Sequence, residues 1–142
     1  MCELLTEVTK ENAFLITEFC QLAGDSLKTF RYFNSRSLDV IGNHIITYVD
    51  MLGGKPVSYG HLDKEGSKVW LGVCVIKEHI GRGKGKKMVN ALVSFAKRNG
   101  IKEIHLSVDR GNVAAISLYE KLGFAYVSGK AVHFMKLSLC EE

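Results

Sequence analysis

The fold is decided by residues 69–124, which read VWLGVCVIKEHIGRGKGKKMVNALVSFAKRNGIKEIHLSVDRGNVAAISLYEKLGF. This segment opens with an apolar run at residues 69–76, typical of a buried strand, and a second apolar run follows at residues 104–108. Between them lie a turn rich in glycine and lysine and an amphipathic stretch, and a short helical pattern then ends at Gly123. The predicted order is strand, anion-binding turn, helix, strand and helix.

The turn at residues 81–87, GRGKGKK, carries the chemistry of this segment. Glycine alternates there with basic residues, and glycine adopts the backbone angles that let successive N–H groups point toward one site. The helix that follows adds the positive end of its dipole. The turn therefore predicts a phosphate-binding site, whose positive potential is raised by Arg82, Lys84, Lys86 and Lys87.

Two common nucleotide-binding motifs do not fit this turn. A Walker-type loop requires a glycine at Ile80 and a serine or threonine at Lys87. A dinucleotide-binding fingerprint counted from Gly81 and Gly83 requires glycine or alanine at Lys86. The phosphate ligand predicted here is therefore held in another way.

The turn resembles that of the GNAT superfamily, the acetyl-CoA-dependent N-acetyltransferases, whose loop reads Gln/Arg-x-x-Gly-x-Gly/Ala. Gly83 and Gly85 match this pattern, whereas Ile80 departs from its leading Gln or Arg. The block Asn112…Ala115…Leu118-Tyr119-Glu120-Lys121-Leu122-Gly123-Phe124 also matches, in the expected order and spacing. The resemblance covers the C-terminal half well and about the first sixty residues only loosely.

The pattern and the resemblance together predict an α/β protein of the α+β type with the GNAT fold. This fold is a mixed, mostly antiparallel central sheet of about six to seven strands with helices on both sides. Beyond the deciding segment we expect an edge strand at residues 2–8 and a helix from the N-cap Thr9 to about Leu22. A helical or irregular segment is expected at residues 25–43. Strands are expected at residues 45–51, 56–63 and 68–76. The helix after the turn should stop at Gly100. A helix at residues 113–122 should follow, and then a hairpin of residues 125–129 with 132–138.

Composition is that of one globular domain over residues 1–142, with 46% hydrophobic and 24% charged residues. No apolar run reaches the roughly 18 residues of a membrane helix, and MCELLTEVTK does not resemble a signal peptide. We therefore expect a soluble, cytoplasmic protein. The four cysteines form no Cys-x-x-Cys pair, so neither a disulfide framework nor a metal site is predicted.

The net charge of +4 is modest and much of it lies in the turn, which contains no aromatic residue for stacking bases. This argues against nucleic acid as a partner, and three alternating glycines argue against an ordinary solvated surface. We expect a monomer or homodimer that binds acetyl-CoA and an amine acceptor, with no nucleic-acid or membrane partner.

The resemblance implies how acetyl-CoA is bound. The diphosphate would lie on the N–H groups of residues 81–86, with Gly81, Arg82, Gly83, Lys84, Gly85 and Lys86 as its binding residues. The pantetheine arm would run beside Val73 and Val75, and a backbone N–H near Val75 would stabilise the oxyanion. Asn112 opens a helix and can be its N-cap, and the resemblance adds a hydrogen bond from Asn112 to the cofactor arm.

Tyr119 is the candidate general acid. A phenol with an ordinary pKa near ~10 is protonated at neutral pH and can return a proton to the leaving thiolate. From spacing alone Tyr119 is a packing residue of an amphipathic helix, and the acid role comes from the resemblance.

The general base has no direct signal, because Val69 stands where some members of the superfamily carry a glutamate. Alternation places Tyr59, His61 and Asp63 on one strand face, and His44, Tyr48 and Asp50 on one face of the preceding strand. If the two faces coincide, they form a polar acceptor pocket in which Tyr48, Tyr59 and Asp63 contact the substrate. His61 is the candidate base, since histidine titrates near ~6.5; the alternative is a half-exposed strand histidine without a catalytic role.

The sequence thus predicts an acyltransferase that moves an acetyl group from acetyl-CoA to a primary amine by direct attack. A small-molecule acceptor is favoured over a protein N-terminus or lysine. The alternatives left open are those protein acceptors and a non-catalytic acyl-CoA-binding module on the same fold.

Overall fold

The structure, a computed structural model, describes residues 5–23, 44–76, 79–81 and 83–139. The segment expected at residues 25–43 and the side chain of Arg82 lie outside the described residues. In chain order, the elements are β1 (Thr6–Glu7), a 3-10 helix η1 (Lys10–Asn12), α1 (Phe14–Ala23), β2 (Ile46–Leu52), β3 (Lys55–Glu65), β4 (Lys68–Val75), α2 (Lys84–Arg98), β5 (Glu103–Asp109), α3 (Val113–Lys121), β6 (Ala125–Ser128) and β7 (Val132–Ser138).

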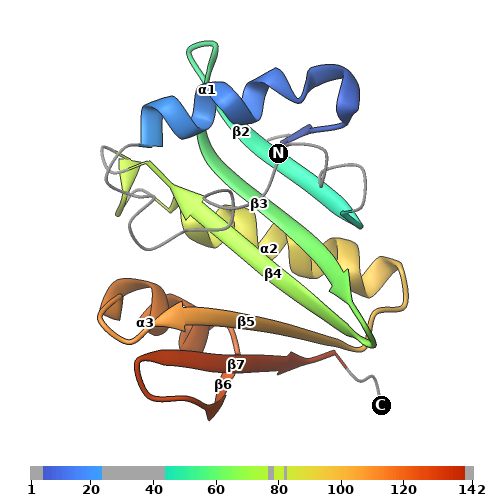
Figure 1. Ribbon diagram of the computed structural model, residues 1–142, viewed down its shortest axis with the longest axis vertical. Coiled ribbons are helices and arrows are strands. Elements are labelled where there is room, and N and C mark those ends of the chain that lie inside the picture. Colours follow the sequence, from blue (N-terminus) through green and yellow to red (C-terminus); the bar gives the residue numbers. More distant parts are fainter. Residues whose placement is uncertain (1–4, 24–43, 77–78, 82, 140–142) are drawn as a thin grey trace.

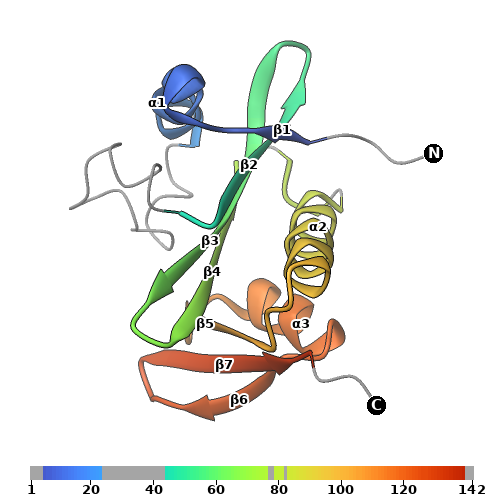
Figure 2. The same ribbon diagram turned by 90° about the vertical axis from the view of Figure 1, so that its right-hand side faces the viewer.

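The described strands form a seven-stranded sheet in the order β1-β2-β3-β4-β5-β7-β6 (Figure 1). Neighbouring strands are antiparallel except for β4 and β5, which are parallel and joined through α2. Helix α1 covers one face of the sheet, and α2 and α3 cover the other (Figure 2). The predicted mixed, mostly antiparallel sheet with helices on both sides is confirmed.

Each face of the sheet has its own hydrophobic core, because alternate strand residues point to opposite sides. On one face, Ile16 and Phe19 of α1 pack against the first half of the sheet, including Val49, Val57, Tyr59 and Cys74. On the other face, Met88, Val89 and Leu92 of α2 and the helix α3 pack over a larger core, which includes Leu62, Leu71, Ile104, Leu106 and Met135.

The hairpin of β2 and β3 forms where the sequence predicted it. Its two-residue turn is Gly53-Gly54, with φ values of 60° and 80°. The type of two-residue turn that matches the natural twist of paired strands requires a positive φ at both central positions. Glycine adopts a positive φ without steric cost.

The predicted N-terminal strand and helix both exist, but their bounds differ from the prediction. An edge strand exists as β1, over two described residues that pair with β2. Thr9 is an N-cap, but of the 3-10 helix, where its Oγ1 accepts from the Glu11 N–H at 3.3 Å while its own N–H donates to Asn12 Oδ1 at 2.7 Å. The α-helix starts later, at Phe14, because this reciprocal cap closes a turn of its own.

Helices α2 and α3 agree closely with the prediction. The C-cap of α2 is Asn99, and Gly100 follows with a φ of 73°, the left-handed conformation that commonly ends a helix. Asn112 is the N-cap of α3, and its Oδ1 accepts from the Ala115 N–H at 3.3 Å. Within the described residues, none of the helices combines the length and apolar character that a membrane span requires.

Strands β4 and β5 diverge, and this divergence positions the candidate site. Trp70 and His105 are the registered pair between the described strands, so the two strands are joined near their N-terminal ends and separate toward their C-terminal ends (Figure 1). Beyond Trp70, β4 and β5 move apart on the side where α2 begins. A ligand that adds along a strand edge needs a separation of this kind.

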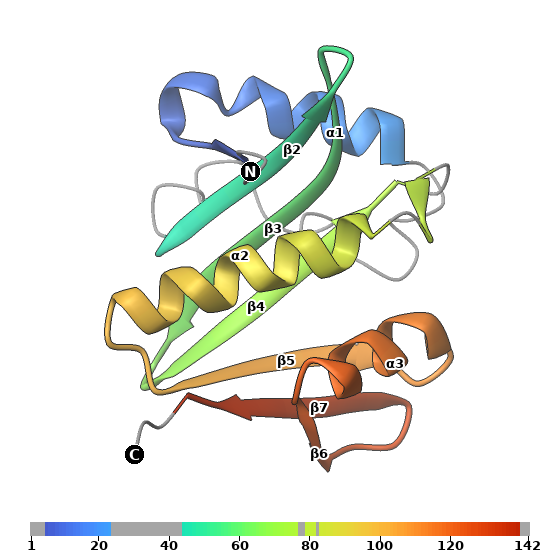
Figure 3. The same cartoon turned by 180° about the vertical axis from the view of Figure 1, so that it is seen from behind.

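Helix α2 runs across β3 and β4 (Figure 3), and Gly60 of β3 allows it to lie close to the sheet. A methyl group on Gly60 would lie 2.5 Å from Met88 Cγ and 2.9 Å from Leu92 Cδ1, both on the inner face of α2. These separations are shorter than carbon atoms tolerate, so glycine at this position sets the distance between helix and sheet.

We predict that Gly60→Ala destabilises the protein by about 1–3 kcal/mol, because the added methyl group overpacks the contact with Met88 and Leu92. Denaturant unfolding followed by circular dichroism measures this change. Gly111→Ala is the matched control, since a methyl group there meets nothing within 4 Å and the φ of Gly111 is not positive. Equal stability of the two variants would contradict the role of Gly60.

Candidate active site

The N-terminus of α2 has the geometry of an anion-binding site. Gly83 is its N-cap with a φ of 78°, and Gly81 has a φ of 87°, both in the left-handed region that favours glycine. No described side chain caps this helix, and Lys87 N–H donates its first bond to the Gly83 carbonyl at 3.0 Å. The N–H groups of residues 84–86 therefore have no acceptor within the helix and face its N-terminal end, where an anion is favoured.

Gly85 lies where β4, α2 and α3 meet. A methyl group on Gly85 would lie 3.2 Å from Leu118 Cδ2 of α3 and 3.8 Å from Val75 Cγ2 of β4. The first turn of α2 is thus seated directly against the C-terminal end of β4. The N–H groups of this turn therefore lie beside the C-terminal end of β4.

Val73 and Val75 occupy that part of β4. They are registered with Gly60 and Ser58 of β3, which places both valines on the face covered by α2. Both lie C-terminal to Trp70, where β4 and β5 have separated. Val75 also lies beside Gly85 in the first turn of α2, and Val73 lies two residues before it on the same face.

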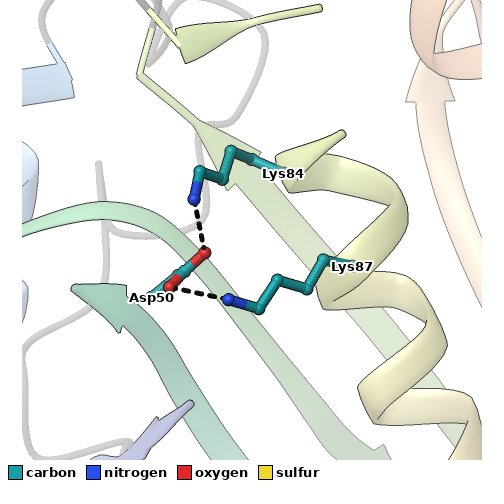
Figure 4. Close-up of polar contacts among 3 residues, drawn as sticks. All are labelled: Asp50, Lys84 and Lys87. Atoms are coloured by element: carbon teal, nitrogen blue, oxygen red, sulfur yellow. Dashed lines mark hydrogen bonds and ion pairs between the residues drawn. The ribbon is translucent and has the colours of Figure 1, made fainter. Parts of the chain in front are cut away.

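Two of the basic residues of the turn are bound to a carboxylate of the protein itself. Asp50 Oδ1 lies 3.1 Å from Lys87 Nζ, and Asp50 Oδ2 lies 3.3 Å from Lys84 Nζ (Figure 4). Lys86, by contrast, is exposed. From the sequence, Lys84 and Lys86 were both predicted to bind the cofactor. In the structure the two lysines have different surroundings.

Tyr119 points into the core beneath α3. Its side chain is buried, with its ring in edge contact with Phe124 at a centroid distance of 5.6 Å. Burial, and secondarily the electrostatic effect of the Cys74 thiol, raises the pKa of Tyr119 above its ordinary value, so the phenol is protonated across the physiological range. Tyr119 is therefore a packing residue that keeps its proton at neutral pH.

Cys74 follows Val73 on β4 and points to the opposite face, toward Tyr59. Burial raises the pKa of the Cys74 thiol to about 12, with a smaller contribution from Cys20. A thiol of this kind is uncharged at neutral pH and is a poor nucleophile. Its side chain contributes packing to the core beneath α1.

The two polar strand faces do not coincide, so the predicted pocket between them is wrong. Val49 is registered with Tyr59 and Thr47 with His61, and paired residues share a face. Tyr48 and Asp50 consequently face α2, whereas Tyr59 and His61 face α1. Alternation along β3 leaves Asp63 on the face of His61, where it is registered with Trp70 of β4. Tyr48 is therefore separated from Tyr59 and Asp63 by the sheet.

A histidine pair lies on the α1 side of the sheet. His61 is only 2% exposed, and its Nδ1 is hydrogen-bonded to the Tyr59 hydroxyl at 2.5 Å. The ring of His44 stacks on His61 at a centroid distance of 4.3 Å, and His44 Nδ1 is hydrogen-bonded to Thr47 Oγ1 at 2.7 Å. His61 is thus a buried, hydrogen-bonded residue, in contrast to the half-exposed alternative.

Sequence reasoning missed two partners in this region, Asp50 for the lysines and His44 for His61. Lys84 and Lys87 are three residues apart, which places them on one side of a helix and hints at a shared partner. Identifying Asp50 as that partner requires the packing of α2 on β2. His44 precedes β2, which begins at Ile46, so strand alternation does not apply to it.

Comparison with known proteins gives relatives of one kind. The uncharacterized N-acetyltransferase YobR of Bacillus subtilis (strain 168) is 32% identical over 99 residues, which are 70% of this chain and 33% of that protein. The spermine/spermidine N(1)-acetyltransferase of the same strain is 39% identical over 66 residues, 45% of this chain and 43% of that protein. The chain therefore matches a third to less than half of the length of these relatives.

Solved structures show the same fold. The PaiA N-acetyltransferase from Thermoplasma acidophilum, in complex with coenzyme A, has a TM-score of 0.77 at 18% identity, covering 97% of this chain and 99% of that one. The putative acetyltransferase YncA from Salmonella typhimurium, with acetyl-CoA, has a TM-score of 0.79 at 23% identity, covering 100% and 96%. A family model, acetyltransferase (GNAT) family, matches residues 13–124. Because this match runs from the start of α1 to just beyond α3, the chain belongs to the GNAT acetyltransferase family.

Proposed function

We propose that the protein is an acetyl-CoA-dependent N-acetyltransferase that acetylates a primary amine of a small molecule. The observation that carries this proposal is the N-terminus of α2, which no described side chain caps and which lies where β4 and β5 have separated. Two of the relatives are named spermine or spermidine acetyltransferases, which supports a small amine as acceptor for this chain as well.

The residues of the α2 turn fit a diphosphate. The N–H groups of residues 84–86 would bind its oxygens, and Lys86 adds an exposed positive charge beside them. Gly81 and Gly83 give the turn the left-handed conformation that exposes these groups. Val73 and Val75 would contact the pantetheine arm, and Asn112, the N-cap of α3, would add a hydrogen bond to it.

Acetyl-CoA supplies the acetyl group, and the side chains of the protein handle the protons. His61, facing α1, would take the proton from the ammonium form of the amine, so that nitrogen bonds to the thioester carbonyl carbon. A backbone N–H near Val75 would stabilise the oxyanion. Tyr119 would give its proton to the sulfur as the carbon–sulfur bond breaks, and the second proton lost by the attacking nitrogen as the amide forms would, through water, restore the phenol. His61 is registered with Gly72 of β4, beside Val73, so base and acid would act from opposite faces of this strand.

The acceptor would approach from the α1 side of the sheet. Asp63 shares this face with His61 and supplies a carboxylate that favours a cationic amine. Tyr59 would act through His61, because the hydrogen bond of its hydroxyl to Nδ1 holds the orientation of the imidazole ring. Tyr48 faces α2, and we leave it out of the acceptor site.

We predict that Gly85→Asp weakens binding of coenzyme A at least about tenfold more than Gly85→Asn, because a carboxylate beside the helix N-terminus repels the diphosphate. The two side chains are nearly equal in size, so both meet Leu118 and only their charge differs. Isothermal titration calorimetry on folded protein measures the difference. Equal affinities of the two variants would rule out the α2 turn as the diphosphate site.

We predict that Tyr119→Phe lowers kcat by about tenfold to a thousandfold, the effect expected when a proton donor is lost. Affinity for coenzyme A should stay near that of the wild type, because the ring and its contact with Phe124 remain. Release of free thiol from acetyl-CoA with a panel of amines gives the rate. Tyr126→Phe, which removes an exposed hydroxyl, is the control. An undiminished kcat in Tyr119→Phe would limit Tyr119 to packing.

We predict that kcat/KM rises with pH as His61 loses its proton, and that His61→Gln removes this limb and slows the reaction. His133→Gln, on the opposite face of the sheet, should keep the wild-type profile. The pH dependence of thiol release in the three proteins tests this assignment. An unaltered limb in His61→Gln would show that another group or water takes the proton.

A further inference from the structure

The first turn of α2 is electrostatically unusual for a helix N-terminus. It contains Lys84, Lys86 and Lys87 and no acidic residue, and no described side chain caps it. Positive charges are unfavourable there, because the helix dipole already places about half a positive charge at this end. Before any anionic ligand binds, this turn requires a negative charge from elsewhere.

Asp50 supplies that charge from β2. Its carboxylate is 3% exposed, and both of its oxygens face lysines of α2, Oδ1 toward Lys87 at 3.1 Å and Oδ2 toward Lys84 at 3.3 Å (Figure 4). The Lys87 contact is a hydrogen bond. The Lys84 contact has ion-pair distance without hydrogen-bond geometry, and Oδ2 has no hydrogen-bond partner among the described residues.

This ion-paired group, Asp50 with Lys84 and Lys87, remains positively charged as a whole, because two lysines outnumber one carboxylate. Each ammonium group has three N–H donors and can hold Asp50 with one while another faces a ligand. A lysine side chain carries large rotamer entropy, which a carboxylate contact removes in advance. Asp50 therefore orders two cations in the first turn of α2, where no described side chain caps the N–H groups of residues 84–86.

We propose that Asp50 is a positioning residue for the phosphate-bearing half of acetyl-CoA. It holds Lys84 and Lys87 against β2, so that the first turn of α2 is ordered and its cations are in place before the phosphates arrive. This inference rests on the proposed function. It adds that a residue of β2, far from the glycine-rich turn in sequence, determines how well that turn binds its anion.

The test compares two acetyl donors, acetyl-CoA and S-acetylpantetheine, which share the thioester and the pantetheine arm but differ in phosphates. We expect Asp50→Asn to lower kcat/KM for acetyl-CoA about tenfold, mainly through KM, and to leave kcat/KM for S-acetylpantetheine unchanged. Glu103→Gln is the control, because Glu103 also lies between two basic side chains, of His105 and Lys136, but at the start of β5, which follows the C-terminal end of α2 rather than its first turn.

A second set of variants separates positioning from folding. Lys84→Met should produce a similar donor-specific loss, because it removes one of the two cations that Asp50 holds. In the double variant Lys84→Met/Lys87→Met, adding Asp50→Asn should cause no further loss for acetyl-CoA, because Asp50 acts through the two lysines. A full additional loss there would overturn the proposal.

The remaining outcomes are also decisive. Equal losses for both donors would make Asp50 a structural residue only, and tighter binding of coenzyme A by Asp50→Asn would show that Asp50 opposes the phosphates. Either result overturns the proposal. If the wild type prefers acetyl-CoA over S-acetylpantetheine and Asp50→Asn keeps that preference, the role of Asp50 is rejected while the proposed phosphate site on α2 stands. If the wild type has no such preference, both the role of Asp50 and the phosphate site on α2 are rejected.

Discussion

The divergence of β4 and β5 is the constraint on which the candidate site depends. The two strands are parallel, joined through α2, and registered at Trp70 and His105 near their N-terminal ends. Beyond that pair the two strands move apart, and α2 begins at the same end of the sheet. In the proposed function, this arrangement places strand backbone and a helix N-terminus side by side for an extended ligand with an anionic end.

Close packing of α2 on the sheet maintains this surface. Gly60 has no side chain to keep Met88 and Leu92 away from the sheet. Gly85 likewise has none at its contact with Leu118 and Val75. The helix is held at its middle by apolar packing and at its first turn by the ion pairs with Asp50. Binding groups at a helix N-terminus act by position, so the residues that seat the helix matter as much as the turn that begins it.

Much of the fold was predictable because its signals are local. The deciding segment alternates apolar runs with an amphipathic stretch, Gly53-Gly54 specifies a tight hairpin, and Gly100 ends α2. The glycine-rich turn is equally local, since its function depends on the backbone angles of a few consecutive residues. The prediction failed at Thr9, because an N-cap residue can begin either an α-helix or a 3-10 helix. Thr9 caps the 3-10 helix rather than α1.

The sequence by itself determined the order of the elements, the uncapped glycine turn and the family resemblance that the comparisons confirm. Only the tertiary structure decided which side chains meet. Strand register placed Tyr48 and Asp50 on one face and Tyr59 and His61 on the other, and a shift of one residue would have reversed this. It also brought His44 onto His61 and Asp50 to Lys84 and Lys87. These contacts join residues from different elements, and no local pattern encodes them, because they depend on how the sheet pairs and how α2 packs on it.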